Sequence, residues 1–124
     1  MGGRSIREGN AVQEKSYRFA LRIVRMYQHL SDEKREFILS KQALRSGTSI
    51  GANVEEALGG ASRRDFAAKL NIAYKEARET DYWLRLLKDA GYLDEDAFRS
   101  VESDCTELRR LLYSIIKSTR TSSE

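Results

Sequence analysis

The stretch "RSGTSIGANVEEALGG", residues 45–60, places four of the chain's eight glycines among small polar residues. The rest of the 124-residue chain lacks proline and resembles nearly continuous helix. Small residues here allow another helix to approach closely, and packing offsets the cost of about 1 kcal/mol for each helical glycine. A kink at Gly51 is the alternative, because helices often bend where glycine and serine occur together. Both interpretations place residues 45–58 within a helix, and Gly59 and Gly60 begin the break that follows it.

Apolar residues upstream recur at spacings of three and four along residues 11–30, which predicts an amphipathic first helix. Its expected buried face comprises Tyr17, Ala20, Leu21, Ile23, Val24, Tyr27 and Leu30. Ser31 and Asp32 are favourable N-cap residues. We therefore expect the second helix over residues 33–58.

Two more helices follow the glycine-rich stretch. Ser62 and Asp65 form a capping box, which predicts a third helix from Arg63. Its expected inner stripe is Phe66, Leu70, Ala73, Ala77, Thr80, Leu84 and Leu87. Gly91 suits a left-handed C-cap, and Asp94 suits the N-cap of a fourth helix. The expected inner stripe of that helix is Phe98, Val101, Cys105, Leu108, Leu112 and Ile115.

These patterns predict an all-α fold, an antiparallel up-down-up-down four-helix bundle over residues 11–118. Residues 1–10 are expected to form a loose arm, and residues 119–124 a frayed tail. The single cysteine, Cys105, excludes an internal disulfide, and no segment is long and apolar enough for a membrane span. We expect a cytoplasmic protein with no membrane partner.

Residue types that carry catalysis are few and poorly spaced. The only histidine, His29, has no second ligand at zinc spacing, and Cys105 occupies an expected core position. The carboxylates lack the Glu-x-x-His pattern of di-iron bundles. Asn53 and Glu56 share a helix face, where a polar contact between helices, with Arg45 or a tyrosine hydroxyl, is favoured over catalysis. We expect neither an enzyme nor a metal or cofactor.

Charge is unevenly distributed along the chain. The formal net charge is +3, yet residues 1–31 hold six lysines and arginines against two acids. Lys15, Arg18, Arg22 and Arg25 follow helical spacing as one basic stripe. Solvated helix positions would explain such a stripe in a monomer. In an oligomer, repeated copies favour phosphate binding, to which Arg63 and Arg64 at the start of the third helix would add.

The third helix carries more apolar surface than one core stripe requires. Tyr82 and Trp83 lie beside that stripe, and excess apolar surface often marks association between proteins. Packing and a subunit interface are both compatible with Trp83. We prefer a subunit interface for the pair.

Residues 44–93, "LRSGTSIGANVEEALGGASRRDFAAKLNIAYKEARETDYWLRLLKDAGYL", resemble the four-helix-bundle proteins encoded in intervening sequences of bacterial 23S ribosomal RNA genes. The matching elements are Arg45 with the small-residue run to Ser49, Asn53 and Glu56, Arg63 and Arg64 before Phe66, and the "GYL" of residues 91–93. The resemblance extends over residues 17–118. Gly51 stands where the family often has proline, and Ala57 where it often has glycine.

The resemblance implies a bundle that assembles into a homopentamer. The chain is also similar to the accessory protein of diversity-generating retroelements, a basic pentameric bundle that partners a reverse transcriptase and binds nucleic acid. We therefore expect a non-enzymatic oligomer that binds structured RNA or DNA through phosphate contacts. The alternative is a structural adaptor for a protein such as a reverse transcriptase, without a direct role in nucleic-acid binding.

Overall fold

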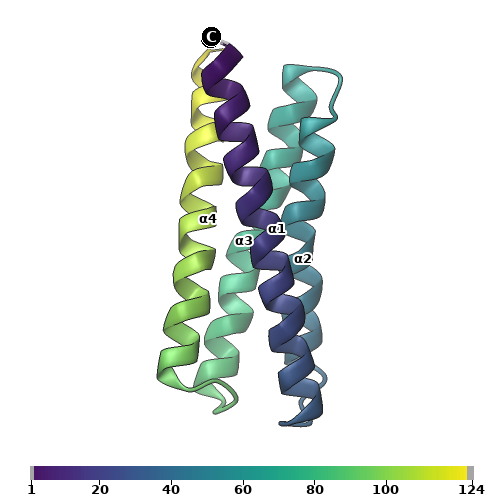
Figure 1. Cartoon of the computed structure of the whole chain (residues 1–124), viewed down its shortest axis with the longest axis vertical. Coiled ribbons are helices and arrows are strands. Elements are labelled where there is room, and N and C mark those ends of the chain that lie inside the picture. Colours follow the sequence, from purple (N-terminus) through teal and green to yellow (C-terminus); the bar gives the residue numbers. More distant parts are fainter. Residues whose placement is uncertain (1, 123–124) are drawn as a thin grey trace.

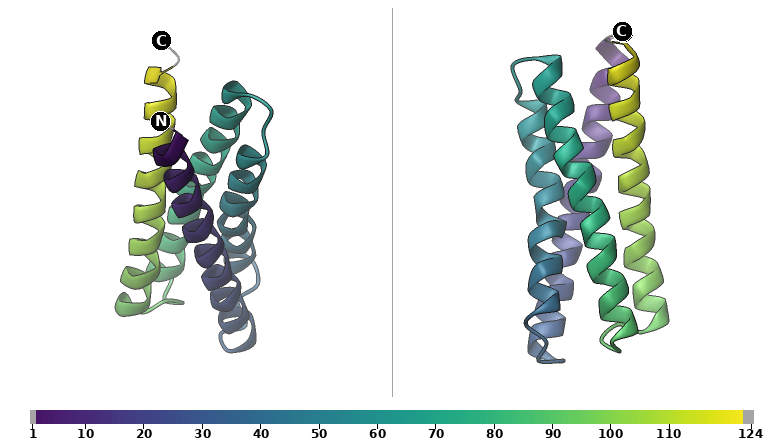
Figure 2. Two further views of the ribbon diagram at one scale, coloured as in Figure 1. Left: turned by 45° about the horizontal axis from the view of Figure 1, so that its top comes forward. Right: turned by 180° about the vertical axis from the view of Figure 1, so that it is seen from behind.

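Four long helices run alternately up and down, as the sequence predicted (Figure 1). In this computed structural model the backbone is described for residues 2–122 and the side chains for residues 11–120. The helices are α1 (Gly2–Asp32), α2 (Leu39–Leu58), α3 (Arg63–Asp89) and α4 (Glu95–Ser122). Helices adjacent in the chain pack extensively, while α1 and α4 make the smallest contact and close the bundle. The two chain ends lie at the same end of the molecule (Figure 2).

Helix α1 is longer than the sequence indicated. Its backbone is helical from Gly2, so the prediction of a loose arm over residues 1–10 is wrong for residues 2–10, and Met1 lies outside the described residues. Once a helix is nucleated, each further residue adds a hydrogen bond, and no proline interrupts this segment. At the other terminus α4 continues to Ser122, beyond the predicted start of the frayed tail at residue 119, and residues 123–124 lie outside the described part of the chain.

The connection between α1 and α2 corrects the predicted start of the second helix. Helix α1 continues through Ser31 to Asp32, and α2 begins only at Leu39. The Ser31 hydroxyl donates back to the Tyr27 carbonyl at 2.8 Å and caps no following helix. The intervening turn contains Arg35 in the left-handed region, with φ of 56°.

Glu36 caps α2 in place of the predicted residues. Its buried carboxylate accepts hydrogen bonds from the backbone N–H groups of Ile38, Leu39 and Ser40 at 3.0, 2.9 and 2.7 Å. These donors belong to the first turn of a helix, where no intrahelical acceptor exists. Burial alone would raise the pKa of Glu36, but the three backbone donors outweigh burial and lower it.

The glycines of α2 permit a close approach of α1. A Cβ at Gly47 would lie 2.9 Å from Ile23 Cγ1, and a Cβ at Gly51 would lie 3.3 Å from the Ser16 carbonyl oxygen. Helix α2 is continuous through both positions. The close-approach interpretation of the stretch is therefore confirmed, and Gly51 does not interrupt the helix.

Local signals around α3 and α4 behave as expected. Ser62 Oγ accepts from the Asp65 N–H at 3.1 Å, Gly91 has φ of 91°, and Asp94 Oδ1 accepts from the Ala97 N–H at 2.8 Å. Thr80, the polar residue of the α3 stripe, is fully buried with its Oγ1 2.9 Å from Ser46 Oγ of α2. This hydroxyl pair explains why a polar residue is tolerated at a core position.

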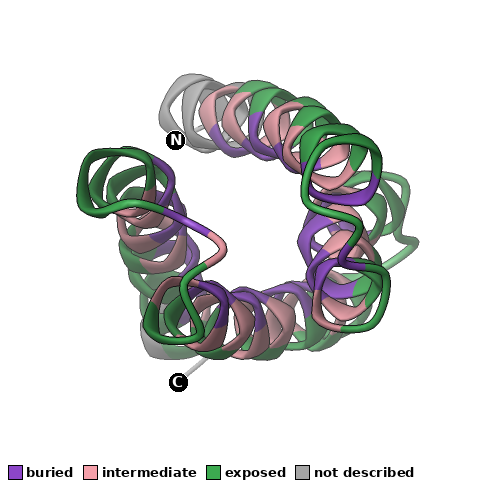
Figure 3. Ribbon diagram, turned by 90° about the horizontal axis from the view of Figure 1, so that it is seen from below, coloured by how far each residue is buried: buried purple, intermediate pink, exposed green. Residues whose placement is uncertain are grey.

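The core lies between the inner faces of all four helices (Figure 3). The predicted α1 face is only partly correct. Ile23 and Leu30 are buried, but Tyr17 and Leu21 are 69% and 40% exposed. The α1 residues buried in the core are Val12, Phe19, Ile23 and Leu30, accompanied by buried Ser16. Within residues 2–122, no helix has the length and apolarity to cross a membrane.

Candidate nucleic-acid interface

Two cations of the predicted α1 stripe join α1 to α4. Lys15 Nζ lies 3.4 Å from Glu107 Oε2, and Arg22 Nη1 lies 2.7 Å from Asp104 Oδ2. Arg22 also donates to Ser100 Oγ at 2.6 Å. The α4 carboxylates thus neutralise two of the four cations that the sequence analysis had assigned to phosphate binding.

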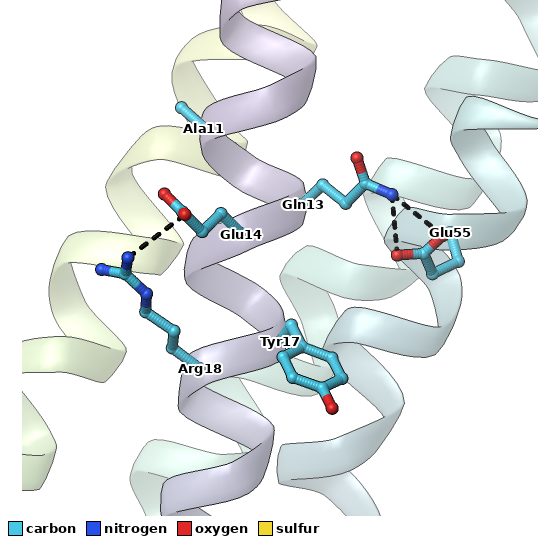
Figure 4. Close-up of a pocket in the computed structure, with 6 residues that line it drawn as sticks. All are labelled: Ala11, Gln13, Glu14, Tyr17, Arg18 and Glu55. Carbon is cyan, nitrogen blue, oxygen red and sulfur yellow. Dashed lines mark hydrogen bonds and ion pairs between the residues drawn. The ribbon is translucent and has the colours of Figure 1, made fainter.

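The other two stripe residues are exposed. Arg18 pairs with Glu14 one turn earlier on α1, at 3.2 Å, whereas Arg25 forms no ion pair among residues 11–120. Arg18 borders a surface pocket, together with Ala11, Gln13, Glu14 and Tyr17 of α1 and Glu55 of α2 (Figure 4). Gln13 donates to both Glu55 carboxylate oxygens at 3.2 and 3.0 Å. The charged and amide groups of this pocket thus bond mainly to one another, as the Arg18–Glu14 and Gln13–Glu55 pairs show.

A second basic surface, which the sequence reasoning did not identify, lies along α3 and α4. It lies on residues 63–78 of α3 and 109–120 of α4, and we call it the α3–α4 basic face. Its cations are Arg63, Arg64, Lys75 and Arg78 of α3 and Arg109, Arg110, Lys117 and Arg120 of α4. Residues 108–120 contain four of these cations and no Asp or Glu.

Two cross-helix contacts place this face. Tyr74 of α3 and Tyr113 of α4 have ring centroids 5.9 Å apart, and the Glu102 carboxyl of α4 lies close to the Asp81 carboxyl of α3. Residues three and four apart share a helix flank. Arg78, four residues after Tyr74, and Arg109, four before Tyr113, therefore lie on the flanks where α3 and α4 meet.

The two acidic residues within residues 63–78 of α3 point elsewhere. Glu76 lies 3.6 Å from Arg45 of α2, and the Asp65 side chain packs beside Gly60 in the α2–α3 turn. Lys75, Arg78 and Arg110 form no ion pair with any side chain of residues 11–120. The contrast with Lys15 and Arg22 favours this surface over the α1 stripe as a site for an external anion. Of the six predicted phosphate-binding residues, only Arg63 and Arg64 belong to it.

The residues that matched the family pattern hold α2 against α3 and form bonds within α2. Arg45 bonds the Glu79 carboxylate, which also accepts from Trp83 Nε1 at 2.9 Å. Burial, and then the charge of Glu79, raises the pKa of the neighbouring Glu76. Glu56 pairs with Lys69 of α3 at 2.7 Å, which is the kind of contact the sequence suggested.

Asn53 does not make the expected polar contact with another helix. Its Nδ2 donates to the Ser49 carbonyl of the same helix at 2.9 Å. Tyr82 is 47% exposed and meets Trp83 edge-on, with ring centroids 5.0 Å apart. Trp83 itself is half-buried against the core. Their role in a subunit interface stays a prediction.

Cys105 lies in the core and His29 on the surface. Cys105 is buried, its Sγ lies 3.4 Å from the Ala77 carbonyl, and burial raises the thiol pKa to about 12. His29 is exposed near the end of α1. Within the described part of the chain, no cluster of three or more histidine, cysteine or acidic residues is arranged to hold a metal ion.

The α3–α4 basic face had a signal in the sequence. The absence of acids from residues 108–120 is visible there, but the residues are separated from Arg63 and Arg64 by more than 40 positions. Only the antiparallel pairing of α3 and α4 joins the two segments into one surface.

Comparison with known proteins agrees with this architecture. A crystal structure of a protein with unknown function from the S23 ribosomal protein family of Bacteroides thetaiotaomicron VPI-5482 is 54% identical, with a TM-score of 0.87. The alignment covers 89% of this chain and 98% of that one. No curated protein matches the chain. The family model for the 23S rRNA-intervening sequence protein matches residues 8–114, and the chain therefore belongs to this family of four-helix proteins.

Proposed function

We propose that this protein binds nucleic acid, without catalysing a reaction, through phosphate contacts to the α3–α4 basic face. The observation that carries the proposal is the concentration of eight lysines and arginines on two adjacent helix segments. Lys75, Arg78 and Arg110 have no intramolecular carboxylate partner among residues 11–120. A cluster of this kind attracts a polyanion because phosphate contacts release the counterions condensed on it.

We propose further that the binding unit is a homo-oligomer, a pentamer by analogy with the family. Support comes from exposed apolar side chains on two opposite helices, Tyr17 and Leu21 on α1 and Ile72 and Tyr82 on α3. Exposed apolar side chains that gather on one surface are typical of sites that another protein covers. Several copies of the basic face in one particle would strengthen its field.

Matched charge reversals test the phosphate contacts. Arg78→Glu with Arg110→Glu changes the α3–α4 basic face, and Arg18→Glu with Arg25→Glu makes the same change of charge on α1. Binding of a labelled RNA hairpin is measured against salt concentration for both variants and the parent protein. Each arginine that contacts a duplex phosphate contributes about 0.9 to the slope of log affinity against log salt.

We expect the α3–α4 variant to lose most of its affinity and show a shallower salt slope, while the α1 variant keeps both. The reverse result would move the site to α1. Unchanged binding by both variants would exclude phosphate contacts at either surface, provided helicity and mass are unchanged.

The exposed α1 residues favour one alternative, a structural adaptor that docks on another protein. Tyr17 is 69% exposed and is not among the buried residues of the core. In this alternative the parent protein binds no RNA even at low salt, and Tyr17→Ser with Leu21→Ser abolishes capture of a reverse transcriptase partner. RNA binding that survives these two substitutions favours the nucleic-acid function.

A further inference from the structure

We propose that the α3–α4 basic face takes a single strand of nucleic acid, with one base stacked on the ring of Tyr113. This inference rests on the proposed function and specifies its ligand. Tyr113 is 55% exposed although it lies in the middle of the basic face. An exposed aromatic ring among cations is the combination by which proteins hold single strands without reading their sequence.

The ring of Tyr113 is supported from α3. Its centroid lies 5.9 Å from that of Tyr74, at an interplanar angle of 43°. Tyr74 in turn packs against the hydrophobic core. This contact restricts the orientations open to Tyr113, so less side-chain entropy is lost when a base stacks on it.

Cations flank the ring at helical spacing. Arg109 precedes Tyr113 by four residues and Lys117 follows it by four, so all three share one side of α4. Each cation is one step of about 6 Å along the helix from Tyr113, so Arg109 and Lys117 are about 12 Å apart. A strand with a base on Tyr113 would thus pass between two cations, and the long side chain of each can reach toward a phosphate on its own side of the ring.

A duplex fits this surface less well. The basic face comprises two packed helices, each about 10–12 Å in diameter with side chains, whereas the major groove is about 12 Å wide. In addition, paired bases present only their edges in the grooves, so a duplex offers no base face to Tyr113. A single strand offers both phosphates and unstacked bases.

Substitutions at Tyr113 separate stacking from charge. Tyr113→Leu removes the ring and Tyr113→Phe keeps it. Phe37→Leu removes a ring of similar exposure in the turn between α1 and α2, outside the basic face, and is the matched control. Each protein is titrated with single-stranded oligo-dT, oligo-U and a DNA duplex of equal length at constant salt. Comparison of the two single strands shows whether the 2′-hydroxyl contributes.

We expect Tyr113→Leu to weaken single-strand binding about tenfold, the effect of losing one stacked base, with duplex binding unchanged. Tyr113→Phe and Phe37→Leu should bind like the parent. Equal single-strand affinity for the parent and Tyr113→Leu would overturn the stacking proposal, as would the same loss on the duplex.

The proposed function fails in a different way. If it is wrong, Arg78→Glu with Arg110→Glu leaves all three affinities unchanged, or the parent protein binds none of the ligands. If only the stacking proposal is wrong, the charge variant still loses affinity while Tyr113→Leu does not.

Discussion

The carboxyl group of Glu102 on α4 lies beside the carboxyl group of Asp81 on α3, close enough for the two groups to share a proton. Asp81 Oδ2 accepts from Arg85 Nε at 3.2 Å, but Asp81 Oδ1 is buried and has no donor among the described residues. Burial, followed by the hydrogen bond and charge of Asp81, raises the pKa of Glu102. Thr106, Arg109 and Cys105 are the other groups of α4 close to the pair. A proton shared by the two carboxyls would satisfy the buried oxygen.

Asp81→Asn should therefore stabilise the protein at alkaline pH. In the parent, the folded pKa of Glu102 exceeds its unfolded value, so this stabilisation is complete below the ordinary pKa of 4.5 and is lost as pH rises through the folded pKa. The asparagine amide supplies a permanent donor and removes one charge. We expect the free energy of unfolding in urea to rise by about 1 kcal/mol at pH 8 and to change little at pH 4.

The exposed Glu33 provides the control, because Glu33→Gln changes the net charge equally without a buried partner. An Asp81→Asn protein with the same pH dependence as the parent would contradict the shared proton.

Removal of the Glu36 carboxylate should destabilise the protein mainly above its folded pKa. Glu36→Ala leaves the three backbone donors at the start of α2 without their acceptor, which we expect to cost about 1–2 kcal/mol at pH 7. The folded pKa is lowered, so this contribution is present above the ordinary value of 4.5 and is lost as pH falls through the folded pKa. This contribution is measured as the difference in the free energy of unfolding in urea between the parent and Glu36→Ala from pH 2 to pH 7, with Glu33→Ala for comparison. Equal costs for the two alanines would show that Glu36 has no special role.

Gly47→Ala should destabilise the bundle although alanine is the better helix former. The new methyl would lie 2.9 Å from Ile23 Cγ1, and overpacking of this kind costs about 1–3 kcal/mol. At Gly59 the nearest atom would be 3.7 Å away, so Gly59→Ala should change the stability by only a few tenths of a kcal/mol. Thermal unfolding of both variants is the measurement. A stabilising Gly47→Ala would mean that α1 and α2 are less closely packed than described.

The proposed oligomer predicts a role for the apolar side chains on α1. Leu21 is 40% exposed, and Leu21→Lys should lower the mass measured by light scattering while leaving the helical circular dichroism intact. An unfavourable buried charge at a subunit contact explains this outcome. Leu58→Lys, at 39% exposure on α2, is the matched substitution. An unchanged mass for Leu21→Lys removes this flank of α1 from the interface.

Short-range signals explain why much of the fold was predictable. Ser62, Gly91 and Asp94 act on backbone groups within three residues, so sequence spacing is enough to interpret them. Glu36 was missed because Ser31 and Asp32 present an equally good cap nearby in the sequence. The choice between them depends on where α1 ends against α2, which is decided by tertiary packing.

The buried face of α1 was harder to predict, also because tertiary packing decides it. This helix carries two apolar stripes, one through Phe19 and Ile23 and one through Tyr17 and Leu21. Periodicity detects both and cannot choose between them. The same difficulty affected the basic stripe, because Lys15 and Arg22 lie on the side of α1 that meets α4 and pair with its carboxylates.

The small contact between α1 and α4 has a consequence for the order of folding. The other three helix pairs join neighbours in the chain, and such local pairing allows a bundle to fold quickly. The α1–α4 contact alone brings together residues as far apart as Arg22 and Asp104, so it carries the largest loop-closure entropy and has the least packing to compensate it. We therefore expect this contact to form last and to open first, with α2 and α3 as the nucleus around which the ends of the chain assemble.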